Sequence, residues 1–127
     1  MNYLITGGVG YIGSHTAVEL LQSGVEKVVV LDNLANSSVE ALRRVEKIAG
    51  GRSPLFIQGD IRDRQRLDRL FDEHAIDAVV HFAGLKAVGE SVAQPLRYYD
   101  NNVLGSLVLF ECMAEAGVRT LVFSSSA

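Results

Sequence analysis

Unbroken apolar runs, separated by segments with helical spacing, constrain this chain more than any other feature of its sequence. Val28–Leu31 is an unbroken apolar run, as expected for a strand that is buried on both faces. Ala78–Phe82 and Thr120–Phe123 are two further predicted strands that consist mainly of apolar side chains. Tyr3–Thr6 and Leu55–Ile57 are shorter runs of the same type. Strands that alternate with helices form a parallel sheet between two helical layers. We therefore predict an α/β fold with a doubly wound parallel sheet of about five strands.

Apolar residues at helical spacing predict the segments between these strands. One helix follows Asn36-Ser37-Ser38, whose side chains can cap its first turn. Another is expected to begin at Pro95 and to continue toward Gly117. The predicted helices are Ser14–Gln22, residues 39–49 with Val39, Leu42, Val45, Ile48 and Ala49 on one side, Arg64–Glu73 with Leu67, Leu70 and Phe71 inward, and the helix from Pro95, with Gly105 inside it.

Composition and charge exclude several function classes. The 12 Lys and Arg residues and 15 Asp and Glu residues give a net charge of −3 without a basic run, which argues against nucleic acid as the main partner. No apolar stretch reaches the roughly 18 residues that span a bilayer, so we expect no membrane partner. The single Cys112 excludes an internal disulfide and favours a cytoplasmic location. His15, His74 and His81 lack the spacing of metal ligands, and no metal site is predicted.

A glycine-rich loop follows the first predicted strand. Gly7, Gly10 and Gly13 are spaced as G-x-x-G-x-x-G between that strand and a helix. Glycines at these places permit a tight turn, let a phosphate approach the backbone, and allow the helix to pack closely on the strand. Helix N-termini favour anions because of their unpaired N–H groups and their dipole. The loop therefore predicts a diphosphate-binding turn, with a flexible turn that binds nothing as the alternative.

Acidic and small residues end the next three predicted strands. Asp32 follows the glycines by about 20 residues, where a carboxylate can accept hydrogen bonds from the ribose hydroxyls of a dinucleotide. Its charge would repel a 2′-phosphate, which predicts NAD rather than NADP. Asp60 ends the third strand and Ala83-Gly84 end the fourth, at the carboxyl edge where parallel sheets bind ligands. A turn or capping role for Asp32 and a helix N-cap role for Asp60 remain alternatives.

Several motifs resemble the extended short-chain dehydrogenase/reductase superfamily, namely Thr6–His15, Asp32-Asn33-Leu34, Gly59–Arg62 and His81–Gly84. Three further motifs narrow the resemblance to its NAD-dependent UDP-glucose 4-epimerases, and these are Leu85–Ser91, Tyr98–Asn102 and Ser124–Ala127. The resemblance covers essentially the whole chain. It implies a Rossmann-like fold and an isomerase of galactose metabolism. Such an enzyme interconverts the UDP-sugars UDP-galactose and UDP-glucose through a 4-keto intermediate with tightly bound NAD.

The resemblance also implies roles for individual residues. Tyr11 and Ile12 would contact the pyrophosphate, Asp60 and Ile61 would reach the adenine, and residues 32–37 would hold the adenosine ribose. Ser126 would be the catalytic hydroxyl that hydrogen-bonds the reacting C4 oxygen of the sugar. Lys86 would meet a ribose or phosphate oxygen, and Asn101 would lie on the nicotinamide side. The cofactor-binding residues are then Gly7, Gly10, Tyr11, Ile12, Gly13, Asp32, Asn33, Leu34, Ala35, Asn36, Ser37, Asp60, Ile61, Phe82, Ala83, Gly84, Leu85, Lys86 and Asn101.

The superfamily's general base is a tyrosine in a Tyr-x-x-x-Lys pair, and none of the four tyrosines of this chain is followed by lysine at that spacing. The length of 127 residues fits one domain. We therefore expect residues 1–127 to form an incomplete NAD-binding domain of Rossmann type, which stops before the base and the substrate domain. Such a chain would bind NAD without epimerising a UDP-sugar. The alternatives are a non-catalytic NAD-binding module and another sugar-nucleotide epimerase or dehydratase of the superfamily.

The segment from Val103 to Ala116 is apolar in nearly every direction around a helix. A helix of this kind is buried on all sides. One side is expected to pack on the sheet, and the other to meet a further helix or a partner subunit. Because the resemblance implies a helix-mediated dimer, we expect a homodimer or self-association through this segment.

Overall fold

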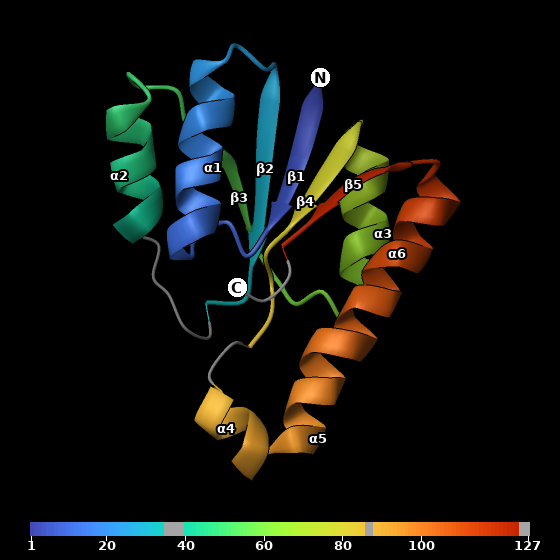
Figure 1. Cartoon of the computed structure of the whole chain (residues 1–127). Helices are drawn as coiled ribbons and strands as arrows, with labels where there is room; N and C mark the ends of the chain where they lie inside the picture. Colours follow the sequence, from blue (N-terminus) through green and yellow to red (C-terminus); the bar gives the residue numbers. More distant parts are fainter. Residues whose placement is uncertain (35–39, 86–87, 125–127) are drawn as a thin grey trace.

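A five-stranded parallel sheet forms the centre of the molecule, in a computed structural model that describes residues 1–34, 40–85 and 88–124 (Figure 1). The strand order is β3-β2-β1-β4-β5, and every neighbouring pair is parallel. The strands are β1 (Asn2–Thr6), β2 (Lys27–Asp32), β3 (Leu55–Gln58), β4 (Ala78–His81) and β5 (Thr120–Phe123). The predicted α/β, doubly wound fold is confirmed, with each strand within two residues of its expected ends.

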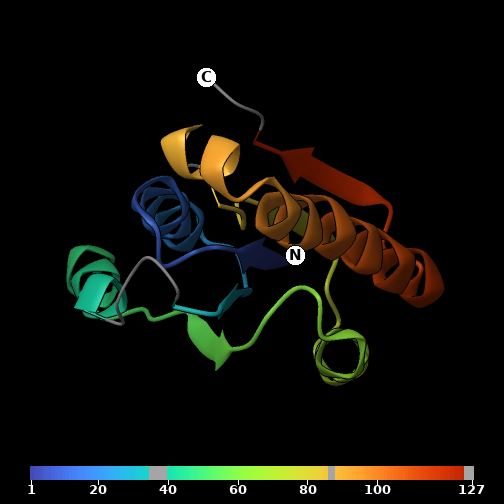
Figure 2. The same ribbon diagram turned by 90° about the horizontal axis from the view of Figure 1, so that it is seen from below.

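Helices cover both faces of the sheet (Figures 1 and 2). α1 (Tyr11–Gln22) and α2 (Glu40–Ile48) lie on one face, and α3 (Arg64–Glu73) and α6 (Gly105–Ala116) lie on the other. The two-residue period of the strands divides their side chains between two cores. In β1, Leu4 belongs to the core under α3 and α6, whereas Ile5 belongs to the core under α1 and α2. None of the helices formed by the described residues has the length and hydropathy of a membrane span.

The helix boundaries follow from their caps. α3 has its predicted bounds, and its N-cap is Asp63, whose carboxylate accepts a hydrogen bond from the Arg66 N–H at 3.1 Å. The N-cap role considered for Asp60 is therefore wrong. α1 begins at Tyr11, three residues before the predicted start, because the Ser14 N–H already donates to the Gly10 carbonyl at 2.9 Å.

The second helix differs from its prediction at one side chain. Val45 and Ala49 are buried and Leu42 is partly buried, as predicted, but Ile48 is 59% exposed. A helical turn separates Val45 from Ala49, so they share one face, and Ile48 is rotated about 100° away from Ala49 toward solvent. Val39 and the proposed cap at residues 36–38 lie outside the described residues.

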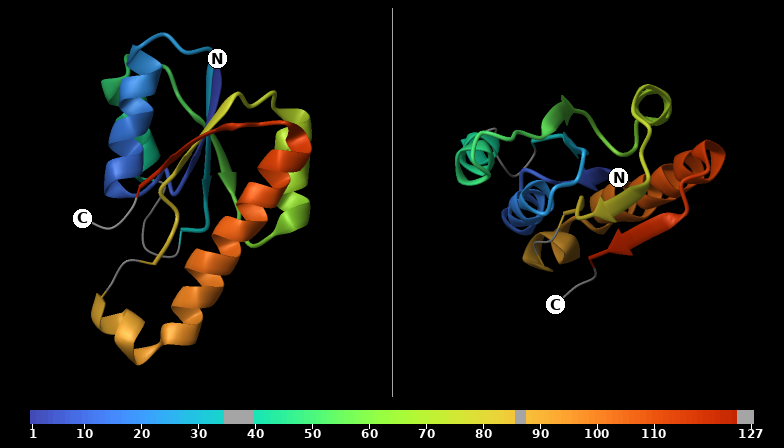
Figure 3. Two further views of the ribbon diagram at one scale, coloured as in Figure 1. Left: turned by 45° about the vertical axis from the view of Figure 1, so that its right-hand side comes forward. Right: turned by 90° about the horizontal axis from the view of Figure 1, so that it is seen from above.

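The region predicted as one long helix from Pro95 is divided into three parts. α5 (Pro95–Tyr98) begins with Pro95 in its first turn, a π-helical segment spans Tyr99–Leu104, and α6 ends at Gly117, which has a φ of +77°. The sequence did not predict α4 (Val88–Ala93), which precedes them. α4 and α5 extend beyond the carboxyl ends of the strands (Figure 3). Together they bring side chains of residues 88–104 over that edge of the sheet.

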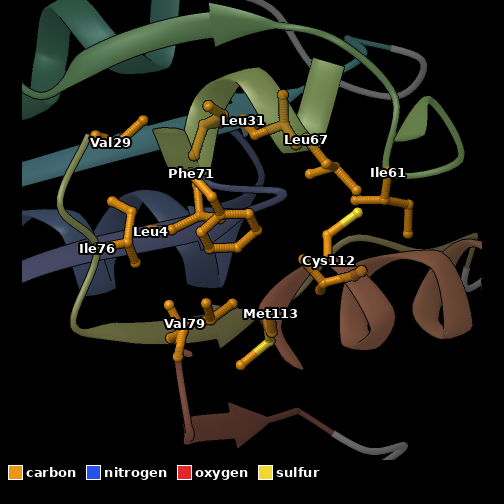
Figure 4. Packing of buried hydrophobic residues seen from close by; sticks show 13 residues of the cluster. Leu4, Val29, Leu31, Ile61, Leu67, Phe71, Ile76, Val79, Cys112 and Met113 are labelled. Carbon is orange, nitrogen blue, oxygen red and sulfur yellow. The ribbon is translucent and has the colours of Figure 1, made fainter. Parts of the chain in front are cut away.

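α6 packs on the sheet along one side, as expected, and its other side is exposed in the single chain, so a partner for that side stays a prediction. Leu109, Cys112 and Met113 are at most 5% exposed, and Cys112 and Met113 reach toward Leu67, Ile61 and Val79 (Figure 4). Burial raises the pKa of the Cys112 thiol to about 12, and the side chain packs as a small buried hydrophobe. Leu107 on the other side is 52% exposed.

Two leucines of α6 test this packing. Leu109 is fully buried, so Leu109→Ala leaves a cavity and is expected to lower the free energy of unfolding by about 2–5 kcal/mol. Leu107→Ala is the matched control, and its effect on monomer stability should stay within about 0.5 kcal/mol. Urea denaturation followed by circular dichroism measures both. Equal losses for the two variants would contradict the described orientation of α6.

Candidate functional site

A cavity of about 510 Å³ opens at the carboxyl ends of β1, β2 and β4. The strand order reverses between β1 and β4, and open α/β sheets bind ligands at this switch point. The cavity is lined by Gly7, Gly10, Tyr11, Ile12, Gly13, Leu31, Asp32, Asn33, Gly59, Ile61, Phe82, Ala83, Gly84, Leu85, Glu90, Tyr98 and Asn101.

The glycine loop forms one wall of the cavity, and its shape depends on the lack of side chains. Gly7 has a φ of +70°, and a Cβ there would lie 2.7 Å from the Ala83 backbone nitrogen. A Cβ on Gly13 would lie 2.3 Å from the Gly7 carbonyl oxygen. Neither position accepts a side chain without displacing backbone. The loop is thus a tight turn that brings the N-terminus of α1 to the cavity, as the glycine spacing predicts.

Backbone N–H groups at this end of α1 are available to an anion. Gly10 is the N-cap of α1 and has no side chain to accept a hydrogen bond from the first turn. Tyr11 and Ile12 line the cavity and are 81% and 55% exposed. The positive end of the helix dipole therefore faces the solvent-accessible cavity, where it favours an anion such as a phosphate group. The residues present fit a dinucleotide.

Asp32 connects β2 to the glycine loop. Its side chain is nearly buried, and its Oδ2 accepts a hydrogen bond from the Val9 N–H at 3.1 Å. Its Oδ1 accepts a second hydrogen bond from the Leu34 N–H at 2.8 Å. The turn role considered for Asp32 is therefore present, and it coexists with a place in the cavity wall. A carboxylate oxygen has a further lone pair, so both atoms can still accept a hydroxyl donor.

Asp60 does not line the cavity, unlike its neighbours Gly59 and Ile61. Its Oδ1 accepts from the Arg62 Nε at 3.0 Å and its Oδ2 accepts from the Arg62 Nη2 at 2.6 Å. These hydrogen bonds lower the pKa of Asp60 below its ordinary value. Arg62 also donates to Asp100 of the π-helical segment. Asp60 thus holds an arginine that connects the end of β3 to the residues above the sheet.

Asn102 is a structural residue of the site that the sequence reasoning missed. Its Oδ1 accepts the Leu85 N–H at 2.7 Å, and its Nδ2 donates to the Leu85 carbonyl at 2.7 Å. The side chain therefore pairs with Leu85 as a neighbouring strand would. Asn101 donates from its Nδ2 to the same Oδ1 at 2.9 Å, and it is buried in the cavity wall. The repeated asparagine was the available signal, and only its first member was chosen.

Most predicted cofactor-binding residues come together at this cavity. Those that line it are Gly7, Gly10, Tyr11, Ile12, Gly13, Asp32, Asn33, Ile61, Phe82, Ala83, Gly84, Leu85 and Asn101. Leu34 and Asp60 lie beside it without lining it. Ala35, Asn36, Ser37, Lys86 and the catalytic candidate Ser126 lie outside the described residues. The lining residues that were not predicted are Leu31, Gly59, Glu90 and Tyr98.

Histidine and cysteine side chains have other roles in this molecule. His81 is 1% exposed at the end of β4, where its ring nitrogens pair with Thr6 and Ser106. His74 accepts a hydrogen bond from Lys27 on the opposite side of the sheet from the cavity opening. Within residues 1–34, 40–85 and 88–124, no group of three His, Cys, Asp or Glu side chains could hold a metal ion.

Known proteins are similar to this chain in sequence and in fold. It is similar to the UDP-glucose 4-epimerase of Neisseria meningitidis serogroup A, at 65% identity over 126 residues, 99% of this chain and 37% of that protein. It is 59% identical over 127 residues to a UDP-glucose 4-epimerase of Klebsiella pneumoniae. This alignment covers 100% of this chain and 90% of that sequence. A crystal structure of the UDP-glucose-4-epimerase from Stenotrophomonas maltophila contains bound NAD and formylated UDP-arabinopyranose. It matches with a TM-score of 0.96 at 56% identity, over 100% of this chain and 37% of that one.

The chain thus spans about 37% of the length of the Neisseria protein. The model of one family, described as the NAD dependent epimerase/dehydratase family, matches residues 3–127. These matches confirm the resemblance to UDP-glucose 4-epimerases that the motifs indicated. They also confirm NAD as the cofactor of the family. The chain belongs to the NAD dependent epimerase/dehydratase family.

Proposed function

We propose that this chain is the NAD-binding portion of a UDP-glucose 4-epimerase. The observation that carries the proposal is the pairing of two features at the switch point of the sheet. One is a glycine loop in which a Cβ on Gly13 would lie 2.3 Å from a backbone oxygen, and the other is the nearly buried carboxylate of Asp32 beside it. Phosphate and ribose recognition require these two features side by side.

In this proposal each part of the cavity holds one part of the dinucleotide. The N-terminus of α1 at Tyr11 and Ile12 binds the pyrophosphate, and Asp32 accepts hydrogen bonds from the adenosine ribose. Ile61 contacts the adenine, while Asp60 orients Arg62 at the same end. The segment Phe82–Leu85 lies along the cofactor, and Asn101 offers an amide on the nicotinamide side. Asn33 and the residues that follow it would complete the ribose pocket.

Bound NAD supplies a hydride acceptor and donor at its nicotinamide ring. The residues of the chain position it and exclude water, and Ser126 is proposed to hydrogen-bond the C4 oxygen of a UDP-sugar. A serine hydroxyl alone lacks the pKa of a general base, and the 127 residues contain no Tyr-x-x-x-Lys pair. We therefore propose that the 127-residue chain binds NAD without converting UDP-galactose.

NAD binding by the purified chain tests the proposal. Native mass spectrometry or calorimetry should detect one NAD per chain, and a coupled assay should detect no UDP-glucose formed from UDP-galactose. Gly13→Ala should abolish NAD binding because its Cβ displaces the Gly7 carbonyl. Gly89→Ala is the matched control, since a Cβ at Gly89 meets nothing within 4 Å. A wild-type chain that does not bind NAD would refute the proposed function, and conversion of UDP-galactose would refute its restriction to binding.

Asp32 determines cofactor choice in this proposal. A 2′-phosphate beside its carboxylate is repelled, so NAD should bind more tightly than NADP. Asp32→Ala removes the repulsion and a hydrogen-bond acceptor, and is expected to reduce the preference for NAD about tenfold or more. Titration of both nucleotides against both proteins measures the ratio. An unchanged ratio would mean that Asp32 serves only the loop contacts with Val9 and Leu34.

Self-association through the helix region is a further part of the proposal. Leu96, Tyr99, Val103, Leu104 and Leu107 are each at least 47% exposed on α5, the π-helical segment and α6. An apolar surface of this kind favours a partner. Light scattering should therefore give a mass above 13.8 kDa, and Leu107→Glu should restore the monomer. Ile48→Glu, on the exposed side of α2, is the control that should leave association unchanged. A monomeric wild-type chain would contradict the prediction.

A further inference from the structure

A buried histidine connects two walls of the cavity without lining it. The His81 Nδ1 lies 2.5 Å from the Thr6 Oγ1, and its Nε2 lies 2.9 Å from the Ser106 Oγ. Thr6 ends β1 and is fully buried, whereas Ser106 belongs to the first turn of α6. His81 thus joins the sheet to the helix that follows the π-helical segment.

The outer partners of this chain of hydrogen bonds fix its direction. The Ser106 hydroxyl donates to the Asn102 carbonyl at 2.6 Å, so its oxygen accepts from His81, and Nε2 carries the proton. In a neutral ring Nδ1 is then an acceptor for the Thr6 hydroxyl. The Thr6 oxygen in turn accepts the Ala83 N–H at 3.2 Å. When His81 is the neutral Nε2–H tautomer, every donor in this series of four hydrogen bonds, from the Ala83 N–H to the Asn102 carbonyl, has an acceptor.

The two ends of this series of hydrogen bonds hold the two ends of one segment of the cavity wall. Through Thr6, His81 holds the N–H of Ala83. Through Ser106, it holds the backbone of Asn102, whose side chain makes two hydrogen bonds with Leu85. Ala83, Gly84 and Leu85 all line the cavity. A shift of the imidazole would therefore move either end of this segment.

We propose that His81 is a positioning residue of the dinucleotide cavity, which holds residues 83–85 and the Asn101–Asn102 pair in place for the nicotinamide half of NAD. The inference rests on the proposed function. It assigns a role in ligand binding to a side chain that does not line the cavity. His81 acts through Thr6 and Ser106, so the hydrogen bonds with these two side chains have separable effects.

Two substitutions of His81 each remove one of its hydrogen bonds with Thr6 and Ser106 and keep the other. The amide of asparagine occupies the place of Nδ1, so His81→Asn keeps a partner for Thr6 and loses Ser106. The longer side chain of glutamine reaches the place of Nε2, so His81→Gln keeps Ser106 and loses Thr6. Ser106→Ala also removes the hydrogen bond between His81 and Ser106, by deleting the hydroxyl of the serine. His74→Gln is the control, because His74 pairs with Lys27 away from the cavity.

Amide hydrogen exchange, measured by NMR on the 127-residue chain without nucleotide, reads each of these two hydrogen bonds directly. His81→Asn and Ser106→Ala should accelerate exchange at Leu85 and leave Ala83 protected. His81→Gln should accelerate exchange at Ala83 and leave Leu85 protected. Nitrogen shifts of the wild-type imidazole should identify the Nε2–H tautomer. Equal acceleration at both amides in all variants, or none, would overturn the proposal, because a purely packing role does not distinguish the two hydrogen bonds.

Nucleotide affinity supplies the second measurement. His81→Asn and Ser106→Ala should weaken NAD binding about tenfold while AMP, held at the Asp32 end, keeps its affinity. Equal loss for NAD and AMP, or no loss for NAD, would overturn the positioning role. A wild-type chain that binds neither nucleotide would instead refute the proposed function. That failure is recognised separately, because the exchange pattern requires no nucleotide.

Discussion

The approach of the glycine loop to the end of β4 determines the geometry of the whole carboxyl edge of the sheet. Gly7 leaves room for the Ala83 backbone, and Gly13 leaves room for the Gly7 carbonyl, both at distances that no Cβ tolerates. These contacts bring α1 onto β1 and aim its N-terminus at the switch point. The close packing fixes the backbone of these two glycines, which costs conformational entropy on folding. Its result is a helix end that stands open beside a buried carboxylate.

Local patterns in the sequence predict most of this arrangement. The apolar runs predict the strands and the glycine spacing predicts the turn. The runs do not predict burial, since β2 is buried inside the sheet whereas β5 at its edge is exposed along its whole length. The capping of α3 by Asp63 shows why the N-cap alternative for Asp60 is wrong. Two aspartates precede the same helix, and only the backbone path determines which one reaches the first-turn N–H. Here Asp60 pairs with Arg62 instead.

Other features depend on contacts between distant residues and could not be read from periodicity. The pairing of Asn102 with Leu85 joins residues 17 positions apart, and the π-helical segment that presents Asn101 has no distinct apolar pattern. The exposed side of α6 has a similar cause. An apolar residue indicates a preference for burial, but the fold decides which of the available faces the sheet covers. The apolar pattern alone therefore does not tell which side of α6 packs on the sheet and which side is left for another partner.

Three side chains at the carboxyl edge replace hydrogen bonds that a regular sheet would make. Asp32 accepts from Val9 and Leu34, Asn102 pairs with both backbone groups of Leu85, and Thr6 accepts from Ala83. Each of them closes a loop that has just left a strand. Loops held in this way lose little conformational entropy when a ligand binds, and binding energy is not spent on ordering them. The side chains that fasten these loops therefore contribute to affinity even where they never touch the ligand.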